Sequence, residues 1–311
     1  MEKFVLGLLL MPMLVLCSGA PAGAQQATRQ QAEFPVADEK PSEVLVKEEP
    51  PADGGRVRFD VGAKVASQYI SRGVAFSEEP SLQPYITMTV ALPELAGGVV
   101  RDVSWFVGNW SSLQSGGPGL GQRNSGDLAG WYEADLYTGI SLGLPNDLNF
   151  SFTYYYYHSP AHSFRGYSDL EWILSYDDTG RWEGIVPLRD FTLSPMLRIT
   201  QEVGRPGRKD AFYVQPSLTP SFNIGKADNP VWVRVPLAIG LSDDYYTTSN
   251  GGTATFGYFR TGLTIAGSFF RLGANPFMVG GGVDFWVLND KVANGLDGTE
   301  LVWRAGFRWA F

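Results

Sequence analysis

The sequence is poor in the residues that hold metals and disulfide frameworks. It has one cysteine, Cys17, and two histidines among 311 residues. A single thiol excludes a disulfide framework and every multi-cysteine metal site, and two histidines do not favour a histidine-rich centre. We therefore expect no metal and no cofactor.

Positive charge and long apolar runs are also scarce. The 24 Lys and Arg residues are outnumbered by 32 Asp and Glu residues, which gives a net charge of −8. This balance argues against a nucleic-acid partner, because phosphate recognition needs a clustered basic surface. After the N-terminus there is no apolar run of about 18 residues, which excludes helical membrane spans. Glycine (37 residues) and aromatic side chains (14%) are abundant instead.

Residues 1–24 have the organisation of a secretory signal. Lys3 supplies the positive charge, residues 4–16 the apolar region, and Ala22-Gly23-Ala24 the cleavage site. A lipoprotein signal acylated on Cys17 is the rival interpretation, and it is disfavoured because Leu16 stands where a small residue is expected. We expect an exported, cysteine-free mature protein.

Residues 25–56 are rich in Gln, Ala, Pro and Glu and have few large apolar side chains. Such a segment buries too little surface to offset its ordering entropy. We expect a disordered acidic periplasmic tail, followed by one domain over residues 57–311.

The domain repeats runs of about ten alternating residues, each followed by a cluster of Gly, Pro, Asn or Asp. The twelve runs are 57–72, 81–92, 100–111, 131–142, 148–158, 167–176, 189–202, 211–222, 231–242, 256–266, 275–288 and 301–311. No segment shows a sustained helical period. The pattern predicts an all-β fold with antiparallel neighbours.

Each run has one apolar and one polar face. The last run places Leu301, Trp303 and Phe307 on one face and Arg304 and Arg308 on the other. This alternation fits a soluble sandwich, with its apolar faces inside, and a transmembrane barrel, with its apolar face toward lipid. The run length and the even run count favour the barrel, because they suit a tilted crossing and return both ends to one side.

Aromatic residues crowd the ends of the runs, as interfacial girdles require. They are Trp131, Tyr132, Tyr154, Tyr156, Tyr167, Tyr176, Phe256, Phe269 and Phe270.

Prolines within the runs each remove a ladder donor, and we expect small bulges to absorb them. They are Pro84, Pro195, Pro216, Pro220 and Pro236.

The last run, which ends Phe307-Arg308-Trp309-Ala310-Phe311, resembles the final strand of Gram-negative outer-membrane proteins. The resemblance implies a barrel in the bacterial outer membrane, and the twelve runs predict that it is a twelve-stranded up-and-down barrel. It also implies that Trp309 and Phe311 form the signal read by the barrel assembly machinery, with the lipid bilayer and lipopolysaccharide as further partners. Tyr69-Ile70-Ser71-Arg72-Gly73 followed by Pro80-Ser81-Leu82-Gln83 resembles an uncharacterised exported bacterial family.

The best catalytic candidate is the segment around His158 and Ser159, with Asp169 as the residue that would orient the base. The segment resembles an outer-membrane phospholipase only in part, because Pro160 and Ala161 follow Ser159. We expect two solvated loop histidines and predict no catalytic residue.

If the apolar face meets lipid, charged residues of both signs line the lumen. The basic ones are Arg58, Lys64, Arg72, Arg198, Arg234, Arg260, Arg304 and Arg308. The acidic ones are Asp60, Glu133, Asp135, Asp169, Glu171, Asp190, Glu202 and Asp284. Eight of each form a nearly neutral wall, which argues against strong ion selectivity.

Twelve strands fall between barrels filled by side chains and open porins. The sequence therefore favours a narrow channel for passive diffusion of small polar solutes, with these charges as constriction candidates. A closed barrel that acts as an envelope scaffold or binding protein is the alternative, and a lipid-modifying hydrolase is a more distant one. The pattern leaves a monomer and a homo-oligomer equally open.

Overall fold

The computed structural model describes residues 55–116, 128–226, 229–248, 251–272, 275–289 and 298–311. The predicted signal over 1–24, and the predicted tail up to residue 54, lie outside the described residues. Among the described residues, no helix is long and apolar enough to cross a membrane. The helical elements there are two single 3-10 turns, η3 (Pro93–Leu95) and η4 (Pro145–Asp147).

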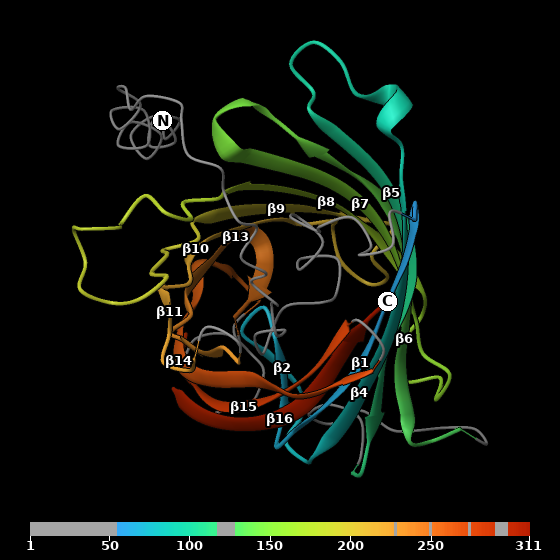
Figure 1. Cartoon of the computed structure of the whole chain (residues 1–311). Helices are drawn as coiled ribbons and strands as arrows, with labels where there is room; N and C mark the ends of the chain where they lie inside the picture. The colour runs from blue at the N-terminus through green and yellow to red at the C-terminus, as the bar shows by residue number, and fades with distance from the viewer. Residues whose placement is uncertain (1–54, 117–127, 227–228, 249–250, 273–274, 290–297) are drawn as a thin grey trace, which may run out of the picture. The chain divides into compact units, whose positions relative to one another are not determined.

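The domain is a closed antiparallel barrel (Figure 1). Its wall strands are β1 (Val57–Ala66), β4 (Ser81–Ala91), β5 (Asp102–Gln114), β6 (Trp131–Gly143), β7 (Leu148–His158), β8 (Tyr167–Tyr176), β9 (Met196–Val203), β10 (Phe212–Leu218) with β11 (Ser221–Asn223), β12 (Val231–Arg234) with β13 (Leu237–Thr247), β14 (Thr253–Leu272), β15 (Asn275–Leu288) and β16 (Thr299–Ala310). The wall closes where β1 pairs with β16, with Val61 opposite Trp309. When each interrupted pair counts as one strand, the barrel has the twelve strands that the sequence predicts.

The interruptions occur at prolines. Pro220 separates β10 from β11, and Pro236 separates β12 from β13. The Val235 amide donates to the Pro220 carbonyl at 2.9 Å, so the two breaks lie side by side in the wall. Pro84 stays within β4, where the pairing with β5 passes from Leu82 directly to Tyr85. Local irregularities thus absorb the missing donors.

The exposure of the side chains is inverted relative to that of a soluble protein. On β16, Leu301 and Trp303 are 64% and 50% exposed, whereas Arg304 and Arg308 are 3% and 5% exposed. A sandwich in water would bury the first pair and expose the second. The predicted phase is therefore correct, and the apolar face of the wall points outward.

Inward glycines make room for tyrosine rings from neighbouring strands. A Cβ atom on Gly108 would lie 2.4 Å from the ring of Tyr137, and one on Gly240 would lie 2.2 Å from the ring of Tyr258. The rings occupy the space that side chains at these positions would take. The inner face of the wall is therefore closely packed at these glycines.

Two predicted runs are too long, and the tenth, 256–266, is too short, because β14 spans Thr253–Leu272. The first wall strand ends at Ala66 rather than at residue 72, because a separate hairpin of β2 (Tyr69–Ser71) and β3 (Val74–Ser77) follows it. Arg72 and Gly73 have φ of 50° and 75°, the left-handed pair that a two-residue hairpin turn requires. The seventh run begins at Met196 rather than at residue 189, so Asp190 lies in the connection before β9.

Candidate functional site

The β2–β3 hairpin lies inside the barrel. Tyr69 donates to Glu133 on β6 at 3.0 Å, and Gln114 at the end of β5 donates to the Phe76 carbonyl at 3.4 Å. At the turn, a Cβ atom on Gly73 would lie 2.6 Å from the Tyr258 ring on β14. These contacts involve inward residues from widely separated strands, so the hairpin crosses the interior.

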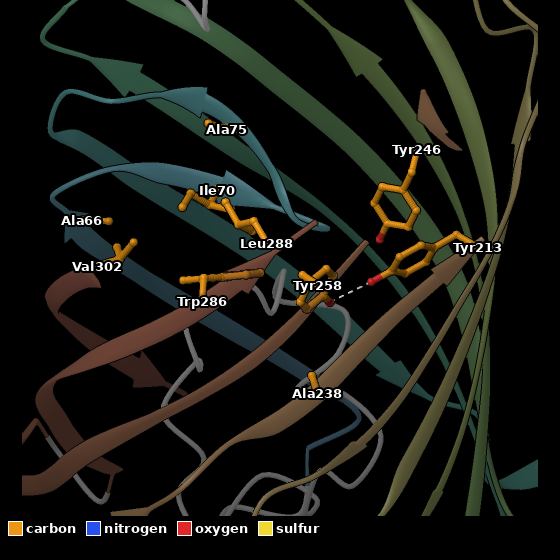
Figure 2. Close-up of a cluster of buried hydrophobic side chains, with 10 residues drawn as sticks. All are labelled: Ala66, Ile70, Ala75, Tyr213, Ala238, Tyr246, Tyr258, Trp286, Leu288 and Val302. Carbon is orange, nitrogen blue, oxygen red and sulfur yellow. Dashed lines mark hydrogen bonds between the residues drawn. The ribbon is translucent and has the colours of Figure 1, made fainter. Parts of the chain in front are cut away.

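Two clusters of buried side chains hold the hairpin. One side, with Tyr69 and Phe76, packs on an aromatic group from β5, β6 and β7. The other side, with Ile70 and Ala75, packs toward β10 and β13 to β16 (Figure 2). There Tyr213 and Tyr258 share a hydrogen bond of 2.8 Å. The hairpin therefore fills the space between two walls of the barrel.

The tip of the hairpin ends in a charged contact. The Arg72 guanidinium donates to the Asp169 carboxylate on β8 at 2.8 Å and to the Tyr157 hydroxyl on β7 at 3.3 Å. Its carbon atom lies 5.2 Å from the ring centroid of Tyr213 and 5.9 Å from that of Tyr245. A carboxylate, a hydroxyl and two aromatic faces thus surround one cation. We call these four wall residues the Arg72 cage.

The electrostatics of the hairpin favour this arrangement. Burial alone would lower the pKa of Arg72, but Tyr157 and Asp169 outweigh it and hold the pKa above its ordinary range. Burial, together with the neighbouring Glu133, raises the pKa of Tyr69. The tip therefore stays cationic, and the Tyr69 hydroxyl stays a proton donor to Glu133.

All the charged residues predicted to line the lumen, except Asp190, lie on wall strands or at the hairpin tip. Of these fifteen, thirteen are buried, and Arg58 and Lys64 are half-buried. The structure pairs several of them. The ion pairs are Arg72–Asp169 at 2.8 Å, Arg304–Asp284 at 3.3 Å, Arg198–Glu171 at 3.6 Å, and Arg308–Asp60.

The buried charges are unevenly distributed around the wall. Strands β6, β8 and β9 carry five buried carboxylates, Glu133, Asp135, Asp169, Glu171 and Glu202. Strands β12, β14 and β16 carry four buried guanidinium groups, Arg234, Arg260, Arg304 and Arg308. Arg198 on β9 and Asp284 on β15 carry the opposite sign, so the wall has a mainly acidic side and a mainly basic side.

The inward aromatic residues were not predicted from the sequence. Tyr132 was predicted for an outer girdle, but it is 1% exposed and belongs to the aromatic group against the hairpin. The signal was available in the alternation, since Tyr155 and Tyr157 share the inward phase of β7 while Tyr154 and Tyr156 are exposed. Aromatic residues thus occur on both faces of the wall.

The hydrolase candidates do not come together. His158 is exposed and stacks on the outward Tyr156, whereas Asp169 is fully buried beneath Arg72. The Ser159 hydroxyl donates to the Tyr132 carbonyl at 2.6 Å and accepts from the Ser163 amide at 2.9 Å. Ser159 therefore fastens its loop, beside an open groove of about 430 Å³ that His158 helps to line.

A closed barrel with an apolar exterior and a charged interior pairs its wall strands with one another and offers lipid an apolar surface. That architecture belongs to bacterial outer membranes. The chain is an outer-membrane β-barrel protein.

No family model and no curated protein matches the chain. Among solved structures it is similar to an outer-membrane channel from Pseudomonas putida F1, with 8% identity, 85% of this chain and 100% of that chain covered, and a TM-score of 0.46. It is also similar to the β domain of the Bordetella autotransporter BrkA (11% identity; 82% and 98% covered; TM-score 0.42). A third is an anion-selective porin from Comamonas acidovorans (12% identity; 82% and 98% covered; TM-score 0.35). The class of the protein follows from its own closure and exposure pattern, independently of these similarities.

Proposed function

We propose that the barrel is a narrow channel for passive diffusion of small polar solutes, and that the β2–β3 hairpin sets its width. The observation that supports this proposal is an inward hairpin whose tip ends on the wall in an ion pair, Arg72–Asp169. The hairpin is held by side-chain hydrogen bonds and two buried clusters, whereas the wall strands are held by backbone ladders.

The polar interior supports the same proposal. Burying charged groups is costly, and a barrel that serves only as an anchor gains more from an apolar filling. Here, paired charges occupy the inward phase of β1, β8, β9, β15 and β16. An interior of this kind suits polar solutes and water.

We place the rim that carries Val57 and Ala310 at the periplasm, because an even strand count returns both ends of the wall to one side. In this orientation the hairpin enters the barrel from the outer rim. Trp309 and Phe311 as an assembly signal, and lipopolysaccharide as the outer neighbour, belong to the same proposal.

Liposome swelling with neutral polyols of increasing size tests the channel. The refolded full chain is expected to admit only the smallest polyols. A variant in which a short Gly-Ser turn replaces residues 69–77 is expected to admit larger ones. Gel heat-modifiability shows whether both proteins are folded. If they are, the proposal is contradicted when liposomes with either protein swell equally for polyols of every size, or when neither kind of liposome swells.

A closed barrel that acts as an envelope scaffold is the second candidate. The nearly complete burial of inward side chains favours it, since Asp169, Arg304 and Tyr258 are at most 3% exposed. A hairpin-replaced variant that folds and stays impermeable would select the scaffold.

A further inference from the structure

The Arg72 cage has the composition of a binding site for a guanidinium cation. We infer that the cage is a binding site for small guanidinium-bearing solutes, and that Arg72 occupies it in their absence. The inference rests on the proposed channel only for the route by which a solute reaches the cage. Binding to the cage does not depend on that channel.

The geometry of the bound Arg72 group supplies the first argument. A planar cation that donates two N–H groups fits Asp169 and Tyr157, and its flat face suits the rings of Tyr213 and Tyr245. Stacking on aromatic faces and forked donation are properties of guanidinium rather than of ammonium.

The Asp169 carboxylate supplies the second argument. Arg72 and Tyr157 both donate to the Oδ2 atom. Within the part of the chain that the structure describes, the Oδ1 atom is buried and has no hydrogen-bond partner. The hairpin backbone limits how Arg72 approaches, whereas an untethered guanidinium is able to donate to both oxygens. Two parallel bonds are the stronger arrangement, so a free solute competes well with Arg72.

The wall beside the cage continues the same chemistry. Glu171 follows Asp169 on the inward face of β8, and Thr153 is its register partner on β7. Over the described residues, Glu171 Oε1 and Thr153 Oγ1 are buried atoms that lack a hydrogen-bond partner. A cation that leaves the cage toward the rim of Val57 and Ala310 therefore meets a further carboxylate, whose other oxygen Arg198 contacts at 3.6 Å, and a hydroxyl. We expect the acidic side of the wall to conduct such solutes.

Isothermal titration calorimetry on the refolded full chain in detergent tests binding without requiring conduction. The probe is methylguanidinium, and its control is methylurea, a neutral compound of nearly the same shape. We expect Arg72→Gln to bind methylguanidinium about tenfold more tightly than the unsubstituted protein, because the competing group is gone. The double variant Arg72→Gln/Asp169→Asn is expected to lose about tenfold or more of that affinity.

Two controls keep the test decisive. Arg72→Met retains the aliphatic stem and replaces Arg72→Gln if the latter does not fold, as judged by heat-modifiability. Arg165→Gln removes an exposed arginine in the connection between β7 and β8, at the outer rim, and is expected to leave the affinity unchanged.

Equal binding of methylurea and methylguanidinium, or an affinity that Asp169→Asn leaves unaltered, would overturn the inference. Binding by the cage in a protein that never conducts would overturn the proposed channel and leave the cage standing.

Discussion

Arg72 and Asp169 are separated by 97 residues in the chain and by 2.8 Å in the structure. One residue lies at the tip of a hairpin and the other lies on the wall strand β8. Their side chains are 11% and 0% exposed, so the pair is screened from water. The hairpin is fastened across the barrel interior at this point.

The first prediction concerns the strength of this fastening. A double-mutant cycle with Arg72→Gln and Asp169→Asn is expected to give a coupling free energy of about 2 kcal/mol, because the hydrogen bond is charge-assisted and buried. The coupling free energy is measured by unfolding each variant in urea and following the gel band of the folded protein. The exposed pair Arg181–Asp147, at 2.9 Å, is the matched control, with less than about 1 kcal/mol expected. Equal couplings for the two pairs would contradict the account.

The second prediction concerns the inward glycines. Gly108→Ala is expected to destabilise the barrel by about 1 to 3 kcal/mol, because the new methyl group meets the Tyr137 ring and the Ile86 carbonyl, which is 2.6 Å away. The urea midpoint reports the loss. Gly97→Ala is the control, since among the described residues no atom outside its two chain neighbours lies within 4 Å of its Cβ position. If the two variants unfold at the same midpoint, the close ring packing is wrong.

The third prediction concerns the lipid-facing surface. Leu136→Arg, on the outward face of β6, is expected to lower the stability of the folded state in bilayers by about 2 to 4 kcal/mol. Leu128→Arg, an equally exposed position in the preceding loop, is expected to cost little. Refolding into vesicles at increasing urea measures both. Equal losses of stability in the two variants would contradict the lipid-facing surface and favour a soluble sandwich.

The fourth prediction concerns the loop between β9 and β10. The Asp210 carboxylate accepts from the Arg205 amide at 2.7 Å and from the Gly204 amide at 3.0 Å, and these bonds lower its pKa. A lowered folded-state pKa gives the loop a stabilisation that is complete above the ordinary carboxyl pKa of about 3.9 and is lost as the pH falls through the lowered value.

Hydrogen exchange at the Gly204 and Arg205 amides, corrected for the intrinsic pH dependence, checks this sign. Protection is expected to fall only below the ordinary carboxyl pKa, and Asp210→Asn is expected to remove that pH dependence. A midpoint at or above the ordinary value would show that the two amides do not bind the carboxylate.

Much of the fold was predictable because the wall strands obey a strict period of two. The phase of β16 follows from Trp303 and Arg304 alone, and burial of the inward charges follows from that phase. The hairpin was not predictable in the same way. Gln68, Tyr69 and Arg72 keep the phase of β1, so periodicity extends the strand, although Ile70 falls in the polar phase. The left-handed turn at Arg72 and Gly73 ends that interpretation.

The partner of Arg72 was also beyond the sequence pattern. Arg72 and Asp169 were both predicted to face the lumen, but pairing between residues from a hairpin and a distant wall strand depends on the closure of the barrel. The cage could not be predicted for the same reason, since Tyr213 and Tyr245 contact Arg72 only when the hairpin turns inward.

The central claim is that the Arg72–Asp169 contact holds the hairpin across a channel. Single-channel conductance in planar bilayers tests it most directly, with the unsubstituted protein, Arg72→Gln, and Arg165→Gln as the control. We predict discrete steps that are larger or more frequent for Arg72→Gln than for the other two proteins. Three folded, heat-modifiable proteins with identical conductance, or with none, would contradict the claim.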